Sequence, residues 1–148
     1  MSLKDQILDD VKQAMRASDK TRLKTLRMAT AAIKQREVDE RIELDDTAVL
    51  AIVEKMIKQR RESAEQYRAG QRPELAEAEE AEIAILQTYL PEPLSDAEID
   101  EIIDQAIAEV GVTDMSGMGQ VMGRIKAGLQ GRADMRAVSG RVRDRLAG

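Results

Sequence analysis

The stretch P-E-P-L-S-D-A-E, residues 91–98, separates two helical parts of the sequence. The residue before a proline avoids the helical region of backbone space, so the two prolines end any helix that reaches them. Directly afterwards, Ser95 and Glu98 have the spacing of a capping box, in which each side chain satisfies a free backbone donor of the first helical turn. A helix stop followed at once by a helix start predicts a domain boundary, with one domain over residues 1–92 and a second over 93–148.

Before this boundary, apolar residues recur at helical spacing in four segments. Asp19 is placed to cap the second helix, and Asp45 or Asp46 the third. Gly70 ends the third helix, and Pro73 suits the first turn of the fourth, where its missing N–H is not needed. The expected core positions of the first and fourth helices are Leu3, Ile7, Leu8, Val11, Ala14 and Met15, and Ala78, Ala81, Ile85, Leu86, Tyr89 and Leu90.

Three shorter helical patterns follow the boundary. Gly111 is placed as the C-terminal cap of the first, the second opens near Thr113 or Asp114, and Asp134 caps the third. No segment shows the alternation typical of a strand, and the absence of Phe and Trp also favours helices. We therefore predict an all-α protein, with an N-terminal bundle of about four helices and a small C-terminal three-helix domain.

The composition excludes several classes of function. There is no Cys and no His, so disulfides, thiolate metal sites, cysteine nucleophiles, catalytic triads and His-based zinc sites are all excluded. No apolar run approaches the length of a membrane span, and the first ten residues carry acids where a signal peptide has an apolar segment. We expect a soluble, cytoplasmic protein with no catalytic residue, no metal site and no small-molecule cofactor.

Five of the nine glycines lie in residues 114–134. Three of them lie in the segment G-M-G-Q-V-M-G at residues 117–123. This segment is neither a dinucleotide fingerprint nor a Walker sequence, and no strand pattern precedes it. Gly119 and Gly123 are four apart on one helical face, where missing side chains would let another backbone approach. The methionines of this region are predicted to be core, with a soft groove for a partner helix as the alternative. They are Met115, Met118, Met122 and Met135.

Two charged runs of the N-terminal domain are interpreted as solvent-facing. The acids of the first, which lack the loop geometry of a calcium site, predict a solvated helix face rather than ligands for a hard cation. In the second, acids and bases recur at spacings of four, which predicts surface ion pairs. The first run is Glu77, Glu79, Glu80 and Glu82, and the second contains Glu54, Lys58, Arg60, Arg61, Glu62 and Glu65.

Charge is distributed unevenly around a net value of −5. Residues 91–114 hold eight acids and no base, whereas residues 115–148 hold seven bases against only Asp134 and Asp144. Six of these bases are Arg, the side chain suited to bidentate phosphate contact. With few acids nearby to pair them, they predict either a solubilising face or a surface for an anionic partner. The candidate residues are Arg124, Lys126, Arg132, Arg136, Arg141, Arg143 and Arg145.

Several motifs resemble those of YqeY-like proteins. They are the segment from Arg60 to Pro91, which ends in Y-L-P; M-G-Q-V-M-G at 118–123; and G-R-A-D at 131–134, followed by V-S at 138–139. The resemblance covers essentially the whole chain. It implies an all-helical protein whose small C-terminal domain is similar to the tail of the B subunit in the glutamine-dependent aspartyl/glutamyl-tRNA amidotransferase, a tail that helps to hold tRNA. The family label is a carbon–nitrogen ligase with glutamine as amido-N-donor.

The likeness to the amidotransferase itself is limited to the tail of its B subunit, because the glutaminase and ATP-dependent activation centres of that enzyme have no counterpart in this sequence. It therefore implies an adaptor, not catalytic by itself, that binds tRNA or another structured RNA. The seven basic residues would face the RNA, on helices shaped by Gly119, Gly123 and Gly131. No aromatic residue follows Tyr89, so contact with backbone and shape is expected rather than base stacking. The alternatives are an accessory subunit of the ligase, and a protein-interaction module in translation without an RNA role.

Overall fold

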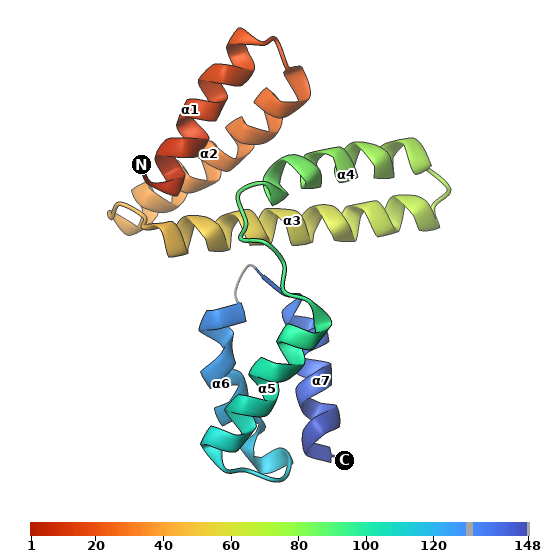
Figure 1. Ribbon diagram of the computed structural model, residues 1–148. Coiled ribbons are helices and arrows are strands. Elements are labelled where there is room, and N and C mark those ends of the chain that lie inside the picture. Colours follow the sequence, from red (N-terminus) through yellow and green to blue (C-terminus); the bar gives the residue numbers. More distant parts are fainter. Residues whose placement is uncertain (130–131, 148) are drawn as a thin grey trace. The chain divides into compact units, whose positions relative to one another are not determined.

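The computed structural model describes residues 1–129 and 132–147, and all regular structure in these residues is helical (Figure 1). The all-α prediction is confirmed. The chain separates into two compact units, Met1–Leu90 and Pro91–Gly148, so the division falls beside the prolines expected at the boundary. That each unit is an independent domain stays a prediction. The elements are α1 (Leu3–Arg16), α2 (Lys20–Glu40), α3 (Asp46–Ala69), α4 (Pro73–Gln87), α5 (Asp96–Val110), the 3-10 helix η1 (Met115–Gly117), α6 (Met118–Leu129) and α7 (Met135–Ala147).

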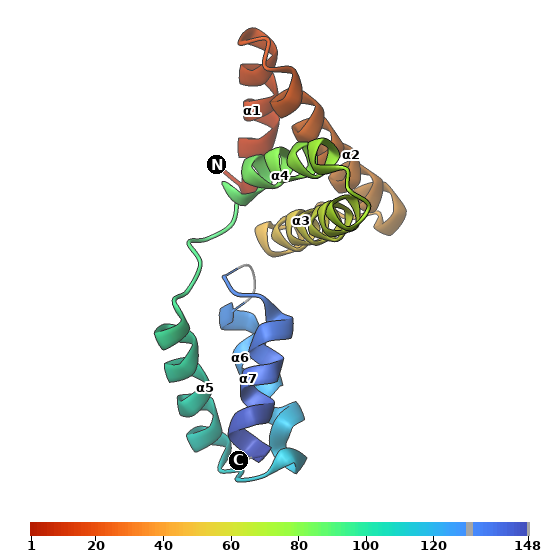
Figure 2. The same ribbon diagram turned by 90° about the vertical axis from the view of Figure 1, so that its right-hand side faces the viewer.

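The first unit consists of two helical hairpins. In both views α1 lies along α2, and α4 lies along α3 (Figures 1 and 2). Local signals begin and end these helices as predicted: the Asp19 and Asp45 side chains accept from the backbone N–H groups of Arg22 and Ala48, Gly70 follows α3, and Pro73 opens α4. The core of the unit is aliphatic, and it includes Ile7, Leu26, Ile33, Val49, Val53, Ile57 and Leu86.

The predicted core positions of α1 and of the α4 segment are confirmed except at four residues. On α1, Ile7 and Ala14 are buried and Leu3 and Val11 pack against the core as predicted, but Leu8 and Met15 are 42% and 52% exposed because the helix is covered on one side only. On α4, the predicted core residues Ala78 and Ala81 are exposed. The helix buries Leu86 as predicted, together with Ala76, and the predicted residues Ile85, Tyr89 and Leu90 pack against the core. The predictions for the four exposed positions were therefore wrong.

The second unit is a group of three helices with its own aliphatic core (Figure 1). Ser95 and Glu98 form the predicted capping box, and Gly111 ends α5 with a left-handed backbone at φ 76°. Asp114 caps η1. The core contains Ile103, Val121, Ile125, Leu129, Val138 and Val142. Met118, Met122 and Met135 pack against it as predicted, whereas Met115 is 41% exposed, so core was the wrong assignment for this residue.

Candidate nucleic-acid interface

The seven candidate basic residues lie on α6, on α7 and in the segment between them. Arg124 and Lys126 belong to α6, and Arg132 precedes α7. The structure divides them into bases that pair with acids of α5 and bases that do not. The α7 members are Arg136, Arg141, Arg143 and Arg145.

Two arginines of α7 form a ladder of ion pairs with α5. Arg141 contacts Asp96 and Asp100, each at 2.8 Å. The hydrogen bond that Arg141 donates to Asp100 raises the pKa of the Arg141 guanidinium above its ordinary value. Arg145 contacts Asp100 at 3.5 Å and also pairs with Asp104. These ion pairs join two helices, and the paired guanidinium groups are less available to an external anion.

Arg124 pairs in the same way, because its Nε lies 3.0 Å from the Glu109 carboxylate of α5. The expectation that few acids would be near enough to pair the bases was therefore wrong. The acids that neutralise three of the seven bases come from the preceding acidic segment, which folds beside them as α5. The acidic and basic segments of the sequence therefore partly neutralise each other in the folded unit.

Lys126, Arg136 and Arg143 are exposed, and their side chains have no acidic partner within residues 1–129 and 132–147. Arg136 and Arg143 are seven residues apart on α7, which places them on the same side of the helix about 10 Å apart along its axis. Lys126 is in the last turn of α6 and Arg136 in the first turn of α7, so both lie toward the connection between these helices.

Arg132 has a structural contact of its own. Its Nε donates to the backbone oxygen of Glu92 at 3.3 Å, and its own carbonyl accepts from the N–H of Leu94 at 2.8 Å. It is also close enough to Glu98 to contribute to the lowered pKa of that carboxyl group, whose main cause is the hydrogen bond from the Ser95 backbone. Arg132 thus ties the segment 92–94 to the start of α7 and remains only partly exposed.

The glycines of α6 do not pack as predicted. Gly119 and Gly123 are exposed, and a Cβ atom added at either would meet nothing within 4 Å in the described structure. No other backbone approaches them there, so the packing interpretation was wrong. Gly117 is the close-packed glycine, since a Cβ at this position would lie 2.3 Å from the Val112 side chain. Gly131, also expected to shape the site, lies outside the described residues.

In the first unit, the two charged runs meet across α3 and α4. Arg60 is only 7% exposed and donates its Nε to Glu82 at 3.1 Å and its Nη1 to the Met56 carbonyl at 3.1 Å. Arg68 likewise pairs with Glu80. The predicted solvated face was therefore wrong for Glu82, and surface pairing at spacings of four was wrong for Arg60. Local spacing could not reveal these partners, because they lie on another helix.

Neither a metal site nor a membrane-spanning helix is evident in the described residues. They contain no group of three or more acidic side chains placed to hold a metal ion. None of their helices combines the length and the apolar character needed to cross a membrane.

Comparison with known proteins adds a family and several relatives. A family model described as Yqey-like protein matches residues 4–146. Altered inheritance of mitochondria protein 41, mitochondrial, from Pyrenophora tritici-repentis is 33% identical over 138 residues, covering 91% of this chain and 76% of that protein. Proteins of the same name from Lachancea thermotolerans and Vanderwaltozyma polyspora are 38% and 35% identical over 104 residues. Those matches cover 68% of this chain and 56% of each relative, so the chain spans only about half the length of these two.

Proposed function

Since the chain belongs to the Yqey-like protein family, we propose that it is a non-catalytic adaptor whose second unit binds tRNA or another structured RNA. One observation carries the proposal: Lys126, Arg136 and Arg143 are exposed cations that no acid of the described structure neutralises. Such side chains can replace the counterions of a nucleic-acid backbone. Arg132, anchored to the Glu92 carbonyl, would lie at the edge of the same surface.

The paired arginines have a different role in this proposal. Arg141 and Arg145 hold α7 against α5, and Arg124 holds α6 against it, so they give the surface its shape rather than its charge. The prediction that all seven bases face RNA is thereby narrowed to four. Because no aromatic side chain follows Tyr89, recognition would depend on phosphate positions and helical shape, not on stacked bases.

The exposed glycines of α6 support close contact with an RNA backbone. Gly119 and Gly123 leave part of the helix surface without side chains, and Lys126 follows within one turn. A phosphate backbone could approach this surface more closely than it could approach an ordinary helix. The fungal relatives are named mitochondrial, which does not favour the cytoplasmic location expected from the sequence. The proposal needs only a compartment that contains tRNA.

The direct test is a titration of the full chain with tRNA at several salt concentrations. If about four phosphates are neutralised, affinity should fall roughly a hundredfold between about 50 and about 200 mM salt. Absence of binding at low salt, or binding that does not depend on salt, would contradict the proposal.

The ligase alternative remains a separate proposal, in which this chain assists amidation only within a larger complex. Adding the chain to a tRNA amidotransferase assay tests it, and an unchanged rate and tRNA affinity would count against it. The protein-interaction alternative loses its original basis, because three of the four methionines assigned to the groove pack against the core. A partner that co-purifies after nuclease treatment would revive it.

A further inference from the structure

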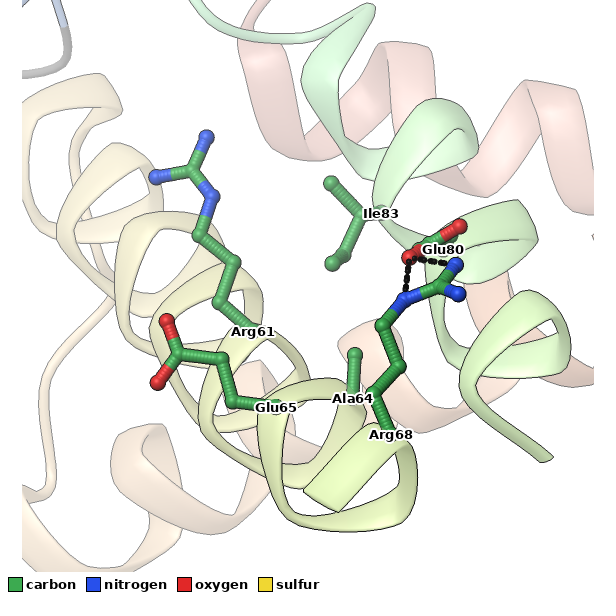
Figure 3. A pocket seen from close by; sticks show the side chains of 6 residues that line it. All are labelled: Arg61, Ala64, Glu65, Arg68, Glu80 and Ile83. Atoms are coloured by element: carbon green, nitrogen blue, oxygen red, sulfur yellow. Dashed lines mark hydrogen bonds and ion pairs between the residues drawn. The ribbon is translucent and has the colours of Figure 1, made fainter. Parts of the chain in front are cut away.

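The distal part of the α3–α4 hairpin contains an open cavity of about 320 Å³. This volume is near the lower limit for small-molecule pockets, so it suits a small ligand. The cavity belongs entirely to the first unit and uses none of the basic residues assigned to RNA. Its lining consists of Arg61, Ala64, Glu65 and Arg68 of α3 and Glu80 and Ile83 of α4 (Figure 3).

One side of the cavity is already neutral. Arg68 donates its Nη2 and Nε to the same Glu80 oxygen, at 2.6 and 3.1 Å (Figure 3). These bonds raise the pKa of the Arg68 guanidinium above its ordinary value. The pair joins the two helices and forms one fixed wall, whose charges compensate each other.

The opposite side carries two charges without partners. Arg61 and Glu65 lie side by side on α3 across the opening from the Arg68–Glu80 pair (Figure 3). They are four residues apart, a spacing at which opposite charges on a helix can pair, yet they form no ion pair with each other or with any other described residue. A cation and an anion are therefore both available at this wall.

Between the two walls the lining is aliphatic. Ile83 is partly buried and points into the opening from α4, and Ala64 is 6% exposed on α3 (Figure 3). Burying an apolar group of a ligand here would remove both surfaces from water and would contribute to binding. A simple anion would gain from Arg61 but would be repelled by Glu65, and a simple cation would experience the reverse.

From this arrangement we infer that the cavity binds a small zwitterion with an aliphatic side chain, that is, a free amino acid. Its carboxylate would contact Arg61, its ammonium group would contact Glu65, and its side chain would cover Ile83 and Ala64. The charges of Arg61 and Glu65 would then be neutralised by the ligand, as those of Arg68 and Glu80 are neutralised by each other. The affinity is modest, because each ion pair is open to solvent.

The test titrates the full chain with L-leucine, N-acetyl-leucine and leucinamide, observed by amide NMR. L-leucine should shift the signals of Ala64 and Ile83 saturably. Each derivative lacks one of the two charges and should bind about fivefold more weakly, the upper range for an exposed ion pair. Absence of saturable shifts at these two residues, or equal binding of all three compounds, would overturn the inference.

Charge variants separate the two contacts. Glu65→Gln should lower the affinity for L-leucine to that for N-acetyl-leucine, which lacks the ammonium charge. Arg61→Gln should lower the affinity for L-leucine to that for leucinamide, which lacks the carboxylate. Both residues are exposed, so helical content should not change. Lys58→Gln is the matched control, since Lys58 lies on the same helix and does not line the cavity. If this control reduces binding as much as the pocket variants do, the inference is wrong.

Discussion

Arg60 on α3 and Glu82 on α4 form an ion pair of 3.1 Å in which the two side chains are only 8% and 13% exposed. The pair joins the helices of the second hairpin. Arg60 also donates to the Met56 carbonyl and contacts the Met28 sulfur of α2 at 3.5 Å. It therefore lies at a junction of three helices, where water cannot easily replace a missing partner.

Removing the acid of this pair should strongly destabilise the first unit. In Glu82→Gln the buried guanidinium loses its counter-charge, and we expect the free energy of unfolding in urea to fall by about 3 kcal/mol. Glu77→Gln is the control, since Glu77 is exposed on the same helix. Equal effects of the two variants would show that the pair is unimportant. Arg60→Met combined with Glu82→Leu should recover much of the stability, because no charge is then left buried.

Two glycines of the second unit should respond to alanine in opposite directions. Gly117→Ala places a methyl group 2.3 Å from the Val112 side chain, and this overpacking should cost about 1–3 kcal/mol. Gly123→Ala enters open space in the middle of α6 and should stabilise the helix by about 1 kcal/mol. Thermal unfolding of both variants provides the measurement. A stabilised Gly117→Ala would contradict the close approach seen here.

Substitution of the unpaired arginines should affect tRNA binding, and substitution of a paired arginine should affect stability. Arg136→Glu with Arg143→Glu should greatly weaken tRNA retention without changing the unfolding temperature. The slope of log affinity against log salt concentration should become shallower by about two, because each of the two replaced arginines no longer neutralises a phosphate. Arg141→Glu should instead lower the unfolding temperature, because a carboxylate then faces Asp96 and Asp100.

A charge-matched control is available in the first unit, where Lys34→Glu with Lys58→Glu makes the same change in net charge on exposed helix positions. This control should retain most of the tRNA affinity. If it weakens binding as much as the α7 variant does, the effect is one of net charge, and the α7 surface is not the interface.

Tyr89 should make stability depend on alkaline pH. Its hydroxyl donates to Asp10 at 2.5 Å, and burial, followed by this hydrogen bond, raises the pKa of the phenol. The neutral phenol is thus favoured in the folded state. The resulting stabilisation is complete below the unfolded pKa of about 10 and is lost as the pH rises above it. Urea unfolding from neutral to alkaline pH should show a steeper decline for the native chain than for Tyr89→Phe; parallel curves would contradict this assignment.

Features governed by neighbouring residues could be predicted from the sequence. The capping box of Ser95 and Glu98, the left-handed cap at Gly111 and the first-turn proline at Pro73 all depend on backbone groups within a few residues. The helix periods also followed from local pattern. For the same reason the all-α class could be predicted.

Features governed by packing between helices could not be predicted from the sequence. Which side of α4 is buried depends on α3 and α2, so Ala76 is enclosed and Ala78 is not. The acids of α5 neutralise Arg124, Arg141 and Arg145 only because three helices associate.

The sequence by itself therefore determined where helices begin and end and which basic residues were candidates, since local hydrogen bonding and periodicity decide these properties. Only the tertiary structure decided which charges remain free. Ion pairs form between groups a few ångströms apart in space, and partners such as Arg141 and Asp100 are 41 residues apart in the chain. Of the seven candidate bases, Lys126, Arg132, Arg136 and Arg143 form no ion pair with the described residues.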